Sequence, residues 1–142
     1  MQNVILSIIL VLWGAPPLFA GDVLSGPVSA SVERVIDGDT VKMRALIWVD
    51  QELVVSVRVA GVDAPELFRP KCEVEKIKAR AAKHFVEEFL SGRDAVLSNI
   101  QHGKYAGRVV ANIEAEGEDL GAALIAEGFA VSGQRGVWCT GV

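Results

Sequence analysis

The sequence predicts a small closed β-barrel of the OB type, accompanied by two helices. The chain has 142 residues, which is enough for about one domain. Apolar and polar residues alternate over three early segments, as they do in half-buried strands. The apolar spacing then becomes helical, and two further strand segments and a second helix follow. This order, β-β-β-α-β-β-α, is that of a five-stranded OB-type barrel.

The first three strands are predicted to form an antiparallel meander. They are expected at residues 30–36, 39–49 and 53–62. Asp37-Gly38, between the first two, is a strong hairpin signal. The apolar face of the second strand is expected to comprise Val41, Met43, Ala45 and Ile47. The third strand places Val57 and Val59 on one face and Arg58 on the other.

The second half of the chain is expected to contribute both helices and two more strands. The apolar positions of the first helix recur at spacings of three and four; they are Val74, Ile77, Ala81, Phe85 and Phe89. The last two strands are expected at residues 95–101 and 107–115. Glu118 and Asp119 favour the start of the second helix, because the helix dipole attracts acidic groups there. Gly128 is expected to end it.

The N-terminal segment is interpreted as a secretion signal. Residues 4–13 form an almost entirely apolar stretch, which is shorter than the ~20 residues that span a bilayer. The predicted division is a signal peptide at 1–20, a linker at 21–29 and the barrel domain at 30–142. We therefore expect a secreted or periplasmic protein, monomeric and without stable membrane association. The alternative is an uncleaved membrane anchor.

Composition excludes several classes of protein. The 51% hydrophobic content, with 14 Gly and 5 Pro, excludes a disordered, collagen-like or low-complexity chain. A net charge of −4 argues against a protein that coats nucleic acid nonspecifically. A local basic patch is still compatible with it. Residues 69–83 contain six basic and two acidic residues, which indicates either a surface that steers a polyanion or an ordinary solvated helix face.

Two cysteines, Cys72 and Cys139, are the only ones in the chain. An oxidising compartment outside the cytoplasm favours a disulfide between them. A bridge across a loop of this length contributes ~4 kcal/mol in the chain-entropy description. Two unrelated free thiols are the alternative.

The candidate chemistry lies at the ends of the predicted strands. Asp39 begins the second strand and Asp63 ends the third, so pairing of these strands places both carboxylates at one end of the sheet. Two close carboxylates repel unless a proton or a cation lies between them, and their hard oxygens suit calcium or magnesium. Turn capping is the alternative for each aspartate, and it is the preferred interpretation for Asp37. For the Asp39–Asp63 pair both interpretations remain open.

Two arginines, Arg58 and Arg108, flank the same predicted region. A guanidinium fork holds two phosphate oxygens at once, so a pair of arginines beside a cation site would suit a phosphate group. The alternative is that both are ordinary surface arginines.

Three segments of the sequence stand out together: IDGDTVK at 36–42, RVAGVDAPE at 58–66 and KYAGR at 104–108. They resemble the signatures of the staphylococcal nuclease (thermonuclease) family. Their order and spacing fit the family, and the resemblance extends over roughly residues 30–132. It implies an OB-type barrel that cleaves DNA and RNA with calcium and leaves 3′-phosphate ends.

The resemblance also implies a role for each matching residue. The implied calcium ligands are Asp39, Asp63 and the main-chain carbonyl of Ala64. The implied catalytic residues are Arg58, Glu66 and Arg108. The implied substrate-binding residues are Lys104 and Tyr105. The chain departs from the family in its acidic balance and its short C-terminus. The alternative functions are a non-catalytic OB-fold module that binds nucleic acid or oligonucleotides, and a structural domain.

Overall fold

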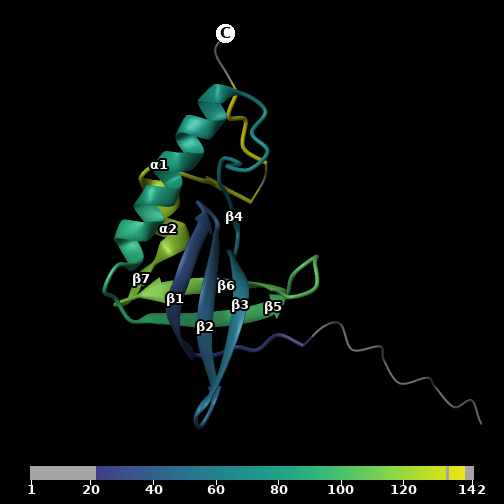
Figure 1. Cartoon of the computed structure of the whole chain (residues 1–142), viewed down its shortest axis with the longest axis vertical. Coiled ribbons are helices and arrows are strands. Elements are labelled where there is room, and N and C mark those ends of the chain that lie inside the picture. Colours follow the sequence, from purple (N-terminus) through teal and green to yellow (C-terminus); the bar gives the residue numbers. More distant parts are fainter. Residues whose placement is uncertain (1–21, 134, 140–142) are drawn as a thin grey trace, which may run out of the picture.

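The computed structural model describes residues 22–133 and 135–139, so the predicted signal peptide at 1–20 lies outside the described residues. The barrel strands are β1 (Val28–Asp37), β2 (Thr40–Trp48), β3 (Gln51–Val59), β5 (Ala95–His102) and β6 (Arg108–Ala115). They are hydrogen-bonded in the order β3-β2-β1-β5-β6. Parallel pairing of β3 with β6 closes the barrel (Figure 1). The predicted fold class is therefore confirmed.

Three two-residue strands lie beside the barrel. β4 (Val62–Asp63) pairs with β8 (Val131–Ser132), and β7 (Glu118–Asp119) pairs with the end of β6. The sequence predicted a single strand over 53–62, but β3 ends at Val59. Gly61 then adopts a positive φ of 71° and turns the chain into β4. This turn directs Asp63 away from the barrel wall, toward the C-terminal part of the chain.

Helix α1 (Glu73–Leu90) and helix α2 (Leu120–Ala126) lie at one end of the barrel (Figure 1). The predicted apolar stripe of α1 is wrong in its first half, because Val74, Ile77 and Ala81 are exposed. The buried positions are instead Glu75, Ala79, Ala82, Val86 and Leu90. A Cβ atom added at Gly38 would lie 2.7 Å from that of Ala82, so close helix packing here requires small residues. No helix within 22–133 or 135–139 is long and apolar enough to cross a membrane.

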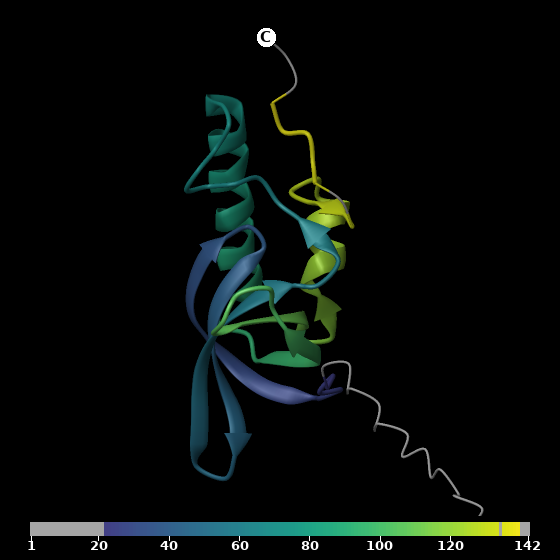
Figure 2. The same ribbon diagram turned by 90° about the vertical axis from the view of Figure 1, so that its right-hand side faces the viewer.

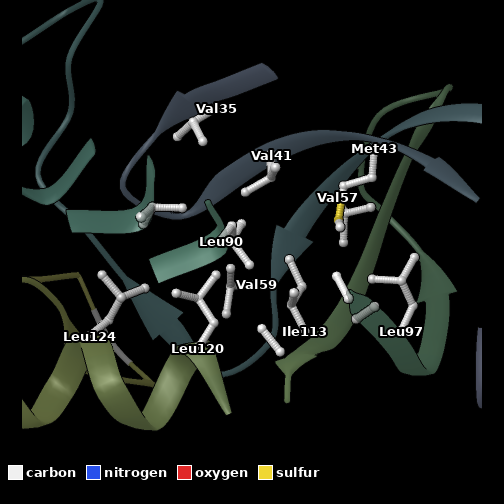
Figure 3. Packing of buried hydrophobic residues seen from close by; sticks show 14 of the residues in the cluster. Val35, Val41, Met43, Val57, Val59, Leu90, Leu97, Ile113, Leu120 and Leu124 are labelled. Atoms are coloured by element: carbon white, nitrogen blue, oxygen red, sulfur yellow. The ribbon is translucent and has the colours of Figure 1, made fainter. Parts of the chain in front are cut away.

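One hydrophobic core fills the barrel and continues under the helices. Figure 3 shows Met43 and Val57 pointing toward Leu97 and Ile113, while Leu120 and Leu124 of α2 pack at the other end. Met43 and Val57 are fully buried. The core thus joins the β2–β3 hairpin to the later strands and to α2.

The β2–β3 hairpin is longer than the barrel needs. Its base belongs to the barrel wall, and its tip extends away from the end covered by the helices (Figure 2). Val41, Met43 and Ala45 are buried as predicted, but Ile47 is exposed because nothing in the described structure covers the tip. β1, which lies between β2 and β5, begins at Val28 rather than residue 30.

Candidate functional site

A cleft of about 730 Å³ opens at the helix-bearing end of the barrel. The β1–β2 turn, the loop after β4, the β5–β6 turn and the C-terminal segment, defined as residues 135–139, all contribute to its walls. The predicted site residues all line it; they are Asp39, Arg58, Asp63, Ala64, Glu66, Lys104, Tyr105 and Arg108. The fold therefore brings together residues from four separate parts of the sequence.

Asp39 is the most deeply placed of the predicted site residues, with 5% of its surface exposed. Its position follows from the tight turn between β1 and β2, where Asp37 pairs with Thr40. Asp39 Oδ1 accepts a hydrogen bond from the Thr40 hydroxyl at 2.9 Å. Its Oδ2 accepts one from the Ala64 amide at 3.1 Å. These bonds fix the carboxylate and tie the loop after β4 to the turn.

Arg58 lies between the two aspartates. The antiparallel register of β2 and β3 places it opposite Thr40, next to Asp39. Arg58 Nη1 lies 2.7 Å from Asp39 Oδ1, and its Nη2 lies 3.4 Å from Asp63 Oδ1. Nη2 also donates to the Val62 carbonyl. One guanidinium thus offsets the repulsion between two carboxylates, while about a third of the side chain stays exposed.

Asp63 also contacts the C-terminal segment. The Gly136 amide donates to Asp63 Oδ2 at 2.9 Å. The segment ends at Cys139, which forms a disulfide with Cys72 across a Cα–Cα distance of 6.0 Å. This confirms the predicted bridge. Cys72 is the N-cap residue of α1, so the disulfide joins the start of the helix to the segment that holds Asp63.

Glu66 follows Pro65 in the loop between β4 and α1. Its Oε1 accepts a hydrogen bond from the Phe68 amide at 3.1 Å, so its carboxylate is held over the loop at the cleft wall. Its own amide donates to Glu75 Oε1 at 3.2 Å. The sequence reasoning did not identify Glu75 as part of this region. Its position three residues after the N-cap Cys72 is that of the acidic residue of a capping box, and this spacing was the available signal.

Arg108, Lys104 and Tyr105 form the wall contributed by the β5–β6 turn. The Arg108 Cζ atom and the Lys104 Nζ atom each lie 5.8 Å from the centre of the Tyr105 ring. Parallel pairing places Arg108 beside Ser56 of β3. Unlike Arg58, Arg108 forms no ion pair within the described part of the chain, so its guanidinium is free to bind an anion.

The cleft also contains residues that the sequence reasoning did not select. Arg135 and Trp138, from the C-terminal segment, line it, and Lys78 of α1 lies 6.0 Å from the centre of the Trp138 ring. The disulfide to Cys72 and the hydrogen bond from Gly136 to Asp63 hold the C-terminal segment at the cleft. No local pattern around them carries that information.

The base of the cleft presents two carboxylates, Asp39 and Asp63, which both contact Arg58. Burial, together with the negative charge of Asp39, raises the pKa of Asp37 to about 6. Asp37 Oδ1 accepts the Asp39 amide, as its predicted turn-capping role requires. Carboxylate and carbonyl oxygens are the ligands of calcium and magnesium. Within residues 22–133 and 135–139, no group of three or more His, Cys, Asp and Glu side chains is arranged to hold a metal ion, so main-chain or solvent oxygens would have to complete a cation site.

Comparison with known proteins identifies a family that the chain matches. A family model described as staphylococcal nuclease homologue matches residues 56–137, from β3 to the C-terminal segment. No curated protein sequence matches the chain. The matched region includes Arg58, Asp63, Glu66 and Arg108, whereas Asp39 lies before it. The place of Asp39 in the site therefore rests on the geometry of the cleft.

Proposed function

Because the chain belongs to the staphylococcal nuclease homologue family, we propose that it hydrolyses phosphodiester bonds in DNA or RNA, with calcium as its cofactor. The observation that carries this proposal is the convergence of Arg58, Arg108 and Glu66 beside the Asp39–Asp63 pair in one cleft. A module that only binds nucleic acid needs cationic groups but has no need of a carboxylate beside them.

The two arginines supply what a phosphodiester requires. The substrate is an anion, and it gains further charge on its equatorial oxygens as a nucleophile attacks. Preorganised guanidinium groups stabilise that added charge. Arg108, without an ion-pair partner in the described residues, is available to the substrate directly. Arg58 is held by Asp39 and presents its remaining donors to the cleft.

Glu66 is the proposed general base. It would orient a water molecule and accept its proton as the oxygen attacks phosphorus. The bond from phosphorus to O5′ would break, and O5′ would leave with a proton taken from solvent. A base must lie within hydrogen-bond reach of the proton that it takes. In the structure Glu66 lines the same cleft as both arginines, and its bond to the Phe68 amide restricts where its carboxylate lies.

Asp39, Asp63 and the main-chain carbonyl of Ala64 would hold calcium. When bound, the ion would offset the negative charge of the phosphate and help to position it. The bonds from Thr40, Ala64 and Gly136 orient the two carboxylates, so the chain itself supplies an organised donor set. Lys104 and Tyr105 would contact the substrate at the outer wall of the cleft.

The proposal includes a location outside the cytoplasm. The Cys72–Cys139 disulfide supports an oxidising compartment, which agrees with the signal peptide expected at 1–20. We propose a secreted or periplasmic monomer.

The decisive experiment replaces Glu66 by glutamine, which keeps the size and removes the basicity. Glu66→Gln should lower the turnover of single-stranded DNA at saturating substrate and millimolar calcium by roughly 10²-fold or more. Glu87→Gln, an exposed change on α1, is the matched control and should digest at the wild-type rate. Digestion by Glu66→Gln at the wild-type rate would exclude the proposed mechanism. DNA binding without digestion by the wild type would favour a binding module.

A further inference from the structure

Glu75 is a buried carboxylate that the proposed mechanism does not use. Only 4% of its surface is exposed, and it forms no ion pair within the described residues. Burial of a charge is costly unless donors surround it. Its position in the first turn of α1 gives some stabilisation from the helix dipole. Hydrogen bonds must offset the rest of the cost of burying this charge.

Each oxygen of Glu75 accepts a different backbone amide of the loop that precedes α1. Oε2 accepts from the Lys71 amide at 2.6 Å, and Oε1 accepts from the Glu66 amide at 3.2 Å. The Sγ atom of Cys139 lies 3.9 Å from Oε2. The carboxylate is therefore enclosed between the loop and the disulfide.

Helix capping explains only one of these two bonds. In a capping box the acidic residue at this position reaches back to the amide of the N-cap residue, here Cys72. The bond to Lys71, one residue earlier, is a shifted form of that contact. Glu66 lies nine positions before Glu75 and belongs to no helix. Its bond to Glu75 therefore contributes to the loop, not to the helix end.

The Glu66 amide is one of two fixed points of this stretch of chain. The Ala64 amide, two residues earlier, is held by Asp39 Oδ2. The backbone that carries Glu66 is thus fixed by one buried carboxylate on each side of Pro65. Loss of either bond would let the Glu66 carboxylate move relative to the arginines across the cleft. Displacements of about 1 Å in such groups can lower rates by up to ~10²-fold.

We propose that Glu75 is a positioning residue, which fixes the backbone of Glu66 so that the Glu66 carboxylate faces the substrate phosphate. This inference rests on the proposed function, because it assigns Glu75 a role through the general base. Glu75 lies in the wall of the cleft, and each of its oxygens is occupied by a loop amide. The disulfide assists it by fixing Cys72, whose Sγ atom accepts the Glu75 amide.

The test replaces Glu75 by glutamine. An amide keeps the shape but offers a single acceptor oxygen, so one of the two loop amides loses its partner. The shorter bond, to Lys71, should survive. We expect Glu75→Gln to lower kcat by about tenfold and to change KM much less. Glu73→Gln, on the same helix turn but exposed, should keep both constants at the wild-type values.

A double-mutant cycle separates positioning from a general loss of structure. In the Glu66→Gln background, Glu75→Gln should have little further effect on kcat, because residues that act through one group are not additive. The full tenfold loss in that background would overturn the proposal and leave the proposed function intact. Hydrogen exchange of the Glu66 amide, which does not depend on activity, should be faster in Glu75→Gln than in the wild type.

The hydrogen-exchange measurement also distinguishes failure of the positioning role from failure of the proposed function. A wild type without nuclease activity would overturn the proposed function, and with it the role of Glu75 in catalysis. An unchanged exchange rate at Glu66 in Glu75→Gln, in a wild type that does cleave DNA, would overturn the positioning role alone.

Discussion

The two ends of the β2–β3 hairpin belong to one antiparallel ladder but differ in burial and in their neighbours. At the base, Thr40 pairs with Arg58, and the neighbouring Asp39 is buried beside the cleft. At the tip, Trp48 pairs with Gln51, and 75% of Trp48 is exposed. The base is charged and enclosed, whereas the tip exposes apolar side chains such as Ile47, Trp48 and Val49 to solvent.

The difference shows that the surroundings, not the strand pairing, decide what a position contributes. At the base, the barrel core, the loop after β4 and the C-terminal segment surround the strands, so a charge there has fixed partners. Nothing in the described structure covers the tip. Pairs of similar residues at the two ends therefore provide matched tests.

The largest difference is expected between the two hairpin arginines. Arg58→Ala removes a proposed phosphate-binding group and leaves Asp39 without its 2.7 Å ion pair, so nuclease activity should fall by roughly 10³-fold. Arg44 pairs with Glu33 and with Glu52 at the surface, where solvent screens ion pairs and makes them weak. Arg44→Ala should retain most of the activity in the same digestion assay. Equal losses in the two variants would contradict the assignment of Arg58.

Substitutions of apolar residues at the two ends of the hairpin should differ in how much they destabilise the protein. Met43→Ala empties a fully buried position on β2 and should cost about 2–5 kcal/mol. For a domain of this size that lowers Tm by roughly 10 °C. Leu46→Ala, three residues further toward the tip and half exposed, should lower Tm much less. Thermal melts followed by circular dichroism would measure both, and similar shifts would show that the tip is covered in solution.

Stabilisation of the folded protein by calcium should depend on a carboxylate beside the hairpin base and not on one at the tip. A ligand at 100 times its Kd stabilises the folded state by about 2.7 kcal/mol, so saturating calcium should raise the Tm of the wild type by several degrees. Asp63→Asn, at the proposed cation site, should lose this shift. Asp50→Asn, at the hairpin turn, should keep it. If calcium raised the Tm of Asp63→Asn as much as that of the wild type, calcium would bind at another site.

The smallest effect is expected for Trp48 itself. Because most of its surface is already in solvent, Trp48→Ser should change the free energy of unfolding by no more than about 0.5 kcal/mol and leave DNA digestion unchanged. Urea titration with a digestion assay would measure both. A larger loss of stability would mean that the tip packs against something in the folded protein.

Several features could be predicted from local pattern. The β1–β2 turn was indicated by Asp37-Gly38, and the order of strands and helices predicted the barrel. The Cys72–Cys139 bridge followed from having two cysteines in a chain with a candidate export signal. The first half of the predicted α1 stripe was wrong, because apolar spacing cannot show that the closest helix contact, at Gly38, admits only small residues such as Ala82. Phe85 and Phe89, in its second half, do pack against the core. The predicted burial of Ile47 was wrong for a related reason. The alternation of apolar and polar residues continues beyond the point where the core ends.

The sequence by itself determined which residue types stand where: two aspartates at strand ends, two arginines, and Glu66 after Pro65. It could do so because turns, strand alternation and short motifs depend on neighbouring residues. Only the tertiary structure decided that these groups share one cleft, that Arg58 bridges Asp39 and Asp63, and that Glu75 holds the Glu66 amide. These contacts join residues that lie far apart in the chain or on different elements. Their distances are set by barrel closure and by the disulfide, which no local pattern encodes.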